Sequence, residues 1–297
     1  MYDVVIIGGG PAGLTAAIYV ARAGKSVALI AEMIGGAAST AHKIDNFSGF
    51  PKINGYELTQ KMYNHALNFN VEFILDKVTS LDLNDSIKKI QINEKRILAK
   101  NIIIATGSKF RKLNLEKENE FLGLGISYCA TCDGNFFRNK NVLVVGGGDT
   151  ALCDALFLSS IAKSTTLIHR RCEFRAAASI VTALKNSSVN LILDSVVTRL
   201  IGEDFLTSVE ISNLLTCEKS VLPTDGLFVA IGSIPNSDLV RNSINLNQDG
   251  YIITNSNMQT NINGVFAAGD VRTTPFRQII TACADGAIAA ESAVSHK

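Results

Sequence analysis

Residues 3–13 read DVVIIGGGPAG, and this stretch decides the fold. A short apolar run rich in Val and Ile is followed by a glycine turn and an Ala-rich segment, an order that predicts a strand, a tight turn and a helix. Gly8, Gly10 and Gly13 match the dinucleotide-binding fingerprint. In it the first glycine allows the turn, the second lets a phosphate approach the backbone, and the third lets helix and strand pack closely. A pyrophosphate would bind at the N-terminus of this helix, where free N–H groups and the helix dipole favour anions.

The same pattern returns at residues 141–151, NVLVVGGGDTA. Gly146, Gly148 and Ala151 occupy the three fingerprint positions. One glycine pattern is weak support for a nucleotide site, whereas two copies, each between a predicted strand and a predicted helix, are strong support. We therefore predict an α/β fold with two Rossmann-like, three-layer ββα nucleotide-binding domains.

Two residues distinguish the predicted sites. Glu32 follows Gly8 at the spacing at which Arg170 follows Gly146, and in this register each residue would end the second strand of its unit. An acidic residue there accepts hydrogen bonds from ribose hydroxyls, whereas an arginine binds a 2′-phosphate. The first site is therefore predicted to bind FAD and the second to bind NADPH.

Further arginines lie in the stretch HRRCEFR, residues 169–175. Arg171 and Arg175 would extend the phosphate clamp of Arg170. The alternative is that these arginines form a solvated face. His169 is expected to be a structural residue or to contact the edge of the ribose, and it is assigned no acid–base role.

The other apolar runs complete the two units. Residues 102–108, IIIATGS, and residues 228–236, FVAIGSIPN, each predict a buried strand that ends in a glycine turn. Residues 264–270, GVFAAGD, are expected to form a strand that ends on Asp270, with a helix from about Arg277 to the end of the chain. Asp270 can accept hydrogen bonds from flavin ribityl hydroxyls, and the dipole of the last helix would favour the reduced flavin ring. Alternatively, Asp270 only caps a turn.

These runs predict a discontinuous first domain. We expect an FAD-binding domain at residues 1–111 and 239–297. The NADPH-binding domain, residues 112–238, is inserted into it through two short linkers that can act as a hinge.

A close cysteine pair lies inside the inserted domain, in SYCATCDGNFF, residues 127–137. Zinc normally needs two such pairs, and the other cysteines and the four histidines are scattered, so we expect no metal site. A structural disulfide across so short a loop restrains little chain entropy. A redox dithiol formed by Cys129 and Cys132 fits best. Asp133 is placed to exchange a proton with it, to cap a helix, or to do both.

Composition excludes several other classes. The chain has 297 residues, of which 47% are hydrophobic and 19% charged, with a net charge of +1 and no basic run. A packed core is therefore expected, and neither a nucleic-acid surface nor a membrane-spanning segment is expected. The N-terminus enters a strand pattern at once, so we expect a cytoplasmic protein without a signal peptide.

The motifs GGGPAG, CATCD, GGGDTA, HRRCEFRA and GVFAAGDVRTTPFRQIITACADGAIAA together resemble the low-molecular-weight, bacterial-type thioredoxin reductases, which are class II pyridine nucleotide-disulfide oxidoreductases. The resemblance covers nearly the whole chain in the family's order. It implies a homodimeric flavoprotein that transfers electrons from NADPH through FAD and a redox disulfide to oxidised thioredoxin. It also implies that the inserted domain rotates during turnover.

The resemblance also implies roles for individual residues. Cys132 would be the flavin-side thiol, Cys129 the thiol that exchanges with the partner, and Asp133 the acid–base residue. The positions expected to contact FAD are Gly8, Gly10, Pro11, Ala12, Gly13, Glu32, Gly35, Gly36, Asn46, Thr106, Gly107, Gly269, Asp270, Gln278 and Ile279. Those expected to contact NADPH are Gly146, Gly148, Asp149, Thr150, Ala151, His169, Arg170, Arg171 and Arg175.

The chain also departs from the family pattern. Ala37 and Ala38 stand where the family usually has Gln and a larger apolar residue, so one flavin contact is expected to be lost. The extra cysteines 153, 172 and 283 are expected to be small buried hydrophobes. Two alternatives stay open: a related flavin disulfide reductase with another protein partner or another electron donor such as ferredoxin, and a flavin-bound redox sensor.

Overall fold

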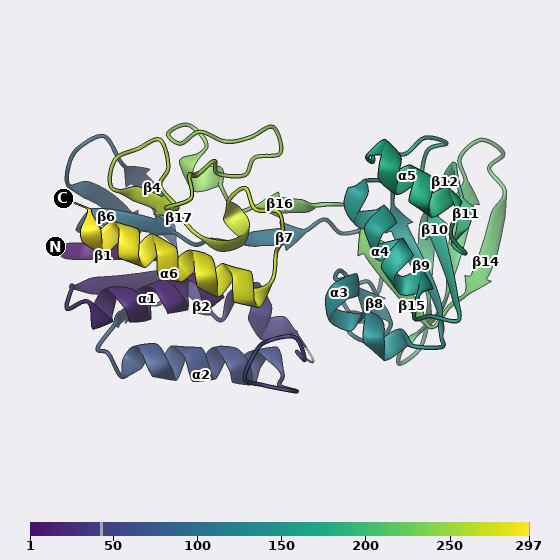
Figure 1. Cartoon of the computed structure of the whole chain (residues 1–297), viewed down its shortest axis with the longest axis horizontal. Coiled ribbons are helices and arrows are strands. Elements are labelled where there is room, and N and C mark those ends of the chain that lie inside the picture. The colour runs from purple at the N-terminus through teal and green to yellow at the C-terminus, as the bar shows by residue number, and fades with distance from the viewer. Residues whose placement is uncertain (42–43, 297) are drawn as a thin grey trace. The chain divides into compact units, whose positions relative to one another are not determined.

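The computed structural model describes residues 1–41 and 44–296, and the chain divides into two compact units (Figure 1). The first unit is Met1–Lys109 with Ile234–Lys297, and the second is Phe110–Ser233. The chain crosses between them twice, in β7 (Ser108–Phe110) and β16 (Ser233–Pro235), which pair as a two-stranded sheet. Which nucleotide each unit binds stays a prediction.

The first unit is built on a mixed sheet. Its parallel part has the order β3-β2-β1-β6, with β17 on the other edge of β6, and the antiparallel strands β5 and β4 follow. The strands are β1 (Tyr2–Gly9), β2 (Val27–Ile34), β3 (Glu72–Ile74), β4 (Val78–Asp82), β5 (Lys88–Ile92), β6 (Lys95–Ile104) and β17 (Val265–Ala267). The helices are α1 (Pro11–Arg22), α2 (Gly55–Leu67) and α6 (Ile279–Ser295).

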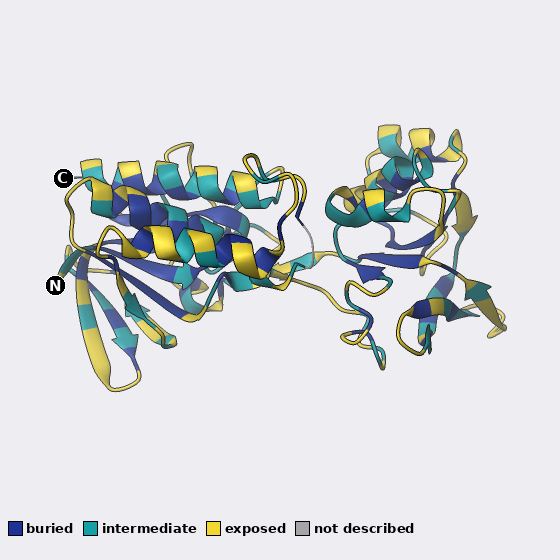
Figure 2. Cartoon of the chain, turned by 90° about the horizontal axis from the view of Figure 1, so that it is seen from below, coloured by how far each residue is buried: buried dark blue, intermediate teal, exposed yellow. Residues whose placement is uncertain are grey.

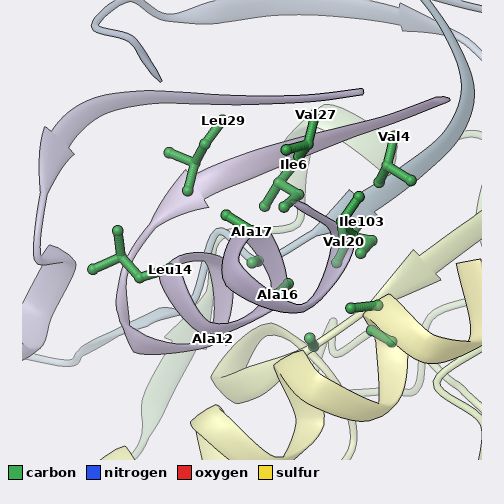
Figure 3. Packing of buried hydrophobic residues seen from close by; sticks show 14 of the residues in the cluster. Val4, Ile6, Ala12, Leu14, Ala16, Ala17, Val20, Val27, Leu29 and Ile103 are labelled. Atoms are coloured by element: carbon green, nitrogen blue, oxygen red, sulfur yellow. The ribbon is translucent and has the colours of Figure 1, made fainter. Parts of the chain in front are cut away.

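Apolar runs in β1, β2 and β6 are buried because both faces of the parallel sheet are covered. Figure 3 shows Leu14, Ala17 and Val20 of α1 pointing toward Ile6 and Leu29 on the strands. A second buried cluster includes the alternate residues of β1 and β2, such as Val5 and Ala28, with Ile90 of β5 and apolar residues of the segment 240–271. Figure 2 shows the matching pattern on the helices, whose exposed residues lie along their outer faces.

The second unit contains a parallel sheet of order β11-β10-β9-β15-β8 and a separate antiparallel sheet of order β12-β13-β14. One buried cluster joins the two sheets, and another lies between the parallel sheet and helix α4. The strands are β8 (Ile126–Ser127), β9 (Asn141–Gly146), β10 (Ser164–Ile168), β11 (Asn190–Ile192), β12 (Ser195–Gly202), β13 (Leu206–Asn213), β14 (Lys219–Pro223) and β15 (Gly226–Ala230). The helices are α3 (Ala130–Asp133), α4 (Asp149–Ser159) and α5 (Ala178–Lys185). Each unit thus has its helical and sheet layers around buried clusters, and the predicted α/β fold class is confirmed.

Three predicted element ends are wrong. Glu32 lies inside β2, which continues to Ile34, whereas β10 ends at Ile168, before Arg170. β17 ends at Ala267, and Asp270 lies in the short 3-10 helix Gly269–Val271, because the positive φ of Gly269, 75°, turns the backbone out of the strand. None of the helices within the described ranges is both long enough and apolar enough to cross a membrane.

Helices α1 and α6 approach each other through small residues. A Cβ placed on Gly286 of α6 would lie 2.2 Å from the backbone oxygen of Ala12 in α1. The neighbouring positions on this face of α6 are also small and buried, among them Ala282, Ala289 and Ala290. The close approach is therefore backbone against backbone.

Gly286→Ala separates this packing constraint from helix propensity. Propensity alone predicts a gain of roughly 1 kcal/mol in the free energy of unfolding, because Ala is the better helix former. The contact with Ala12 predicts instead a loss of about 2 kcal/mol, since the helices must move apart. Urea unfolding followed by circular dichroism measures the sign. Ala284→Ser, at an exposed position of the same helix, should change stability little.

Candidate active site

The cysteine pair lies at the start of a short helix in the second unit. Strand β8 ends at Ser127, Tyr128 follows, and Cys129 is the N-cap residue of α3. Cys129 and Cys132 form a disulfide with a Cα–Cα distance of 5.3 Å. The Cys129 Sγ also accepts a hydrogen bond from the Cys132 backbone N–H at 3.2 Å. The structure thus holds the predicted pair in its oxidised form.

Asp133 is the last residue of α3, and its side chain makes no helix-capping hydrogen bond. Instead its Oδ2 accepts a hydrogen bond of 2.7 Å from the hydroxyl of Ser127. The same hydroxyl oxygen accepts from the backbone N–H of Cys129 at 3.0 Å. Ser127 therefore joins Asp133 to the first cysteine. Sequence reasoning missed this serine, whose only signal was a hydroxyl just ahead of the pair.

Tyr128 is held by a second polar residue that sequence reasoning missed. Its hydroxyl donates to the buried carboxylate of Glu118 at 2.6 Å, and Glu118 also accepts from the backbone N–H groups of Leu113 and Asn114, both at 2.8 Å. Burial, with the hydrogen bond to Glu118, raises the pKa of Tyr128 well above its usual value. The residue before Cys129 is thus a neutral, fixed tyrosine.

The first glycine turn has the geometry that its fingerprint predicts. Gly8 has φ +120°, and a Cβ there would lie 2.2 Å from the Ala105 oxygen. A Cβ on Gly13 would lie 1.9 Å from the Gly8 oxygen, so no larger residue fits at this crossing of strand and helix. Gly10 is different, because a Cβ built on it meets nothing within 4 Å. Open space thus faces Gly10 at the N-terminus of α1, as a bound pyrophosphate requires.

The second glycine turn repeats this arrangement. A Cβ on Gly146 would lie 2.5 Å from that of Ala151, whereas one on Gly148 would meet only the Arg175 oxygen, at 3.8 Å. The turn also holds the loop between β10 and α5, residues 169–177, which we call the arginine-bearing loop. The Arg175 N–H donates to the Gly147 oxygen at 2.7 Å, and the Ala177 N–H donates to the Asp149 carboxylate at 2.8 Å. Asp149 therefore anchors the loop.

His169 packs inside this loop. A Cβ on Gly147 would lie 2.0 Å from the imidazole, whose Nε2 is 3.0 Å from the Glu173 oxygen, and only 8% of His169 is exposed. Burial lowers its pKa, so the ring is a neutral packing group at neutral pH. The geometry favours a structural role for His169 over a contact with the edge of the ribose. Arg170, Arg171 and Arg175 are exposed, and none forms an ion pair with a described carboxylate.

In the first unit the structure brings several predicted flavin-site residues together. A Cβ on Gly36 would lie 3.1 Å from the Gly10 Cα, and one on Gly269 would lie 2.9 Å from the Ala12 Cβ. The Asn46 amide donates to the Gln278 side chain at 3.0 Å. These residues come from five separate segments of the chain and meet around the start of α1 and the start of α6. Glu32 lies farther out, exposed and 3.8 Å from the Lys77 ammonium.

Asp270 is a partly buried carboxylate to which no described group donates a hydrogen bond. Burial raises its pKa to about 6, Arg277 opposes this shift, and Asp285 adds to it. Its loop is held by Asp285 of α6, whose Oδ2 accepts from the Gly269 N–H at 3.1 Å and from Arg272 at 2.9 Å. A carboxylate fixed in this way fits a ligand that brings hydroxyl donors, such as a ribityl chain.

The expectation for the extra cysteines is wrong in part. Cys153 and Cys172 are exposed, because they lie on the outer face of α4 and in the arginine-bearing loop, and Cys283 is half-buried between α6 and α1. Within residues 1–41 and 44–296, no group of three or more His, Cys, Asp or Glu residues is arranged to hold a metal ion.

Comparisons with known proteins agree with this geometry. Residues 2–286 match the model of the pyridine nucleotide-disulphide oxidoreductase family. The thioredoxin reductase of Peptoclostridium acidaminophilum is 43% identical over 99% of this chain and 96% of its own length. That of Bacillus subtilis is 39% identical over 98% and 93%. The crystal structure of thioredoxin reductase from Streptococcus pyogenes has a TM-score of 0.94, with 41% identity over 100% of this chain and 98% of that one. The chain belongs to the pyridine nucleotide-disulphide oxidoreductase family, and within it to the thioredoxin reductases.

Proposed function

We propose that the protein is an NADPH-dependent thioredoxin-disulfide reductase that binds FAD in the unit Met1–Lys109 with Ile234–Lys297 and NADPH in the unit Phe110–Ser233. The observation that carries the proposal is the Cys129–Cys132 disulfide. It lies in the same unit as the second open glycine turn, whose neighbouring arginines are exposed. The names of the relatives, at about 40% identity over nearly the full chain, support thioredoxin as the partner. A homodimer and a cytoplasmic location stay predictions.

Residues of this chain would hold both cofactors. The pyrophosphate of FAD would bind the backbone of Gly10 at the start of α1, and Asp270 would accept from its hydroxyls. The phosphates of NADPH would bind the backbone of Gly148, with the 2′-phosphate among Arg170, Arg171 and Arg175. When bound, the nicotinamide supplies a hydride and the flavin relays its two electrons to a disulfide.

The reduced cysteine pair then reduces the partner by two exchanges. The Cys129 thiolate attacks one sulfur of the partner's disulfide, forming a mixed disulfide, and protonated Asp133 gives its proton to the departing partner thiolate. The Asp133 carboxylate next takes the proton of the Cys132 thiol. The Cys132 thiolate attacks the Cys129 sulfur and re-forms the disulfide, and Asp133 passes the proton to the second partner thiolate. Two electrons and two protons reach the partner, and Asp133 ends as a carboxylate.

Substituting each cysteine tests the proposed exchange. With purified protein, NADPH and oxidised thioredoxin, Cys129→Ser and Cys132→Ser should each abolish thioredoxin reduction, because a single thiol cannot complete the second exchange. NADPH should still bleach the flavin absorbance of both variants. Cys217→Ser, at an exposed cysteine, serves as the control and should keep full turnover. Normal turnover by Cys129→Ser would remove this cysteine from the mechanism, and a wild-type protein without a flavin band would remove the proposal.

The arginine-bearing loop predicts the choice of nicotinamide cofactor. Loss of one guanidinium–phosphate contact typically costs about 1.5–3 kcal/mol, so Arg170→Ala should raise the KM for NADPH at least about tenfold. The KM for NADH, which lacks the 2′-phosphate, should change little. The control is Arg199→Ala, an exposed arginine of the same unit paired with Glu210. Equal effects of Arg170→Ala on NADPH and NADH would show that this loop does not read the 2′-phosphate.

The open space at Gly10 predicts that a substitution there changes flavin affinity without changing the stability of the fold. A methyl group at this position meets no protein atom, so Gly10→Ala should leave the free energy of unfolding of the flavin-free protein within about 0.5 kcal/mol. Flavin affinity should fall, because the methyl group occupies the space of the pyrophosphate. Gly13→Ala is the matched contrast, since its Cβ meets the Gly8 oxygen and should destabilise the fold itself. Undiminished flavin content in Gly10→Ala would place the pyrophosphate elsewhere.

A further inference from the structure

Ser127 lies at the end of β8 with 2% of its surface exposed, and its hydroxyl has three hydrogen-bonding neighbours. The Asp133 Oδ2 lies at 2.7 Å, the Cys129 backbone N at 3.0 Å, and the Cys129 backbone oxygen at 3.3 Å. Two of these neighbours accept hydrogen bonds and one donates. The hydroxyl group itself has one hydrogen to donate and two lone pairs to accept with.

This inventory matches two arrangements of hydrogens. When Asp133 is a carboxylate, the Ser127 hydrogen points to its Oδ2, as the distance of 2.7 Å indicates. When Asp133 is protonated, its O–H can donate to the Ser127 oxygen, and the Ser127 hydrogen can turn to the Cys129 oxygen. The Cys129 N–H keeps the remaining lone pair in both arrangements. The bond between Ser127 and Asp133 therefore survives a change of protonation by rotation of one hydroxyl.

We propose that Ser127 is a positioning residue that keeps the Asp133 side chain in one place, beside the cysteine pair, in both of its protonation states. This inference rests on the proposed function, in which Asp133 alternately gives and takes protons. Because the bond to Ser127 survives the change of protonation, the Asp133 carboxyl group can give and take a proton in the same orientation. The hydrogen bond from the Cys129 N–H holds the Ser127 oxygen beside the cysteine pair, so Ser127 positions Asp133 relative to that pair.

Other ionisable groups near α3 have to be separated from Asp133 in any pH profile. The 3-10 helix Gly134–Phe137 and α4 both pack against α3. The 3-10 helix carries no ionisable side chain, whereas α4 carries Asp149, Cys153 and Asp154. Burial raises the pKa of Asp154 to about 6, so its ionisation falls within the accessible range. Asp154→Asn therefore serves as a control that removes this group alone.

The test is a double-variant comparison of the dithiothreitol-reduced holoenzyme. Its reoxidation is followed between pH 5 and 9 with two oxidants, thioredoxin and the small aromatic disulfide 5,5′-dithiobis(2-nitrobenzoate). Ser127→Ala should slow the second, disulfide-closing exchange about tenfold, the typical value of a hydrogen bond to a charged group, and should move the midpoint of the pH profile to higher pH. In an Asp133→Asn background the same substitution should slow it less than about twofold, because Ser127 acts through Asp133.

Three controls complete the design. Ser127→Thr keeps the hydroxyl and should keep the wild-type pH midpoint. Ser195→Ala removes an equally buried hydroxyl of the same unit, one that donates to the Leu193 oxygen, and should keep the wild-type rate. Asp154→Asn should leave the midpoint in place. Equal slowing by Ser127→Ala in both backgrounds, or no slowing in either, would overturn the inference. If wild-type protein reacts only with the aromatic disulfide, the thioredoxin assignment fails, and the Ser127 comparison is still decided with that oxidant.

Discussion

The structure depends on close contact between backbones that leaves no room for a side chain. Position 13 of α1 rests on the Gly8 oxygen of β1, and position 286 of α6 rests on the Ala12 oxygen. Because strand, helix and helix touch through main-chain atoms, the N-terminus of α1 is held at a fixed height over the sheet. Gly13 and Gly286 are packed against neighbouring backbone, and this packing positions Gly10, whose own side faces open space. The second unit repeats the device with Gly146 and Ala151, so one packing solution serves both predicted nucleotide sites.

A few polar side chains that hydrogen-bond to the backbone hold the polar parts of the site around these contacts. Asp285 binds the Gly269 N–H, and Asp149 binds the N–H of Ala177 at the end of the arginine-bearing loop. Glu118 binds the backbone of Leu113 ahead of the cysteines, and Ser127 links Cys129 to Asp133. Asp285, Glu118 and Ser127 each make several hydrogen bonds, which offset the cost of burying them. Asp270 is the exception, because its carboxylate lacks a donor among the described residues. Such a contrast is typical of a group that waits for a ligand.

Sequence reasoning found what local chemistry determines. The glycine turns, the strand–turn–helix units around them and the cysteine pair were predictable, because each depends on residues within one short stretch. Ser127 and Glu118 were missed, because nothing in their local spacing distinguishes a buried serine or glutamate from a surface one. The predicted end of β17 was wrong, because the sequence does not show that Gly269, within an apolar run, has a positive φ. The prediction that Cys153 is buried was wrong, because its position on the outer face of α4 depends on how that helix packs.

The discontinuity of the first unit has a consequence for how the polypeptide matures on the ribosome. The segment Phe110–Ser233 is continuous and can complete its own core as soon as it has been synthesised. The N-terminal sheet cannot, because its main buried cluster takes Phe266 from β17 and Ala282, Ala289 and Ala290 from α6. A nascent chain therefore exposes an incomplete apolar surface until α6 has emerged.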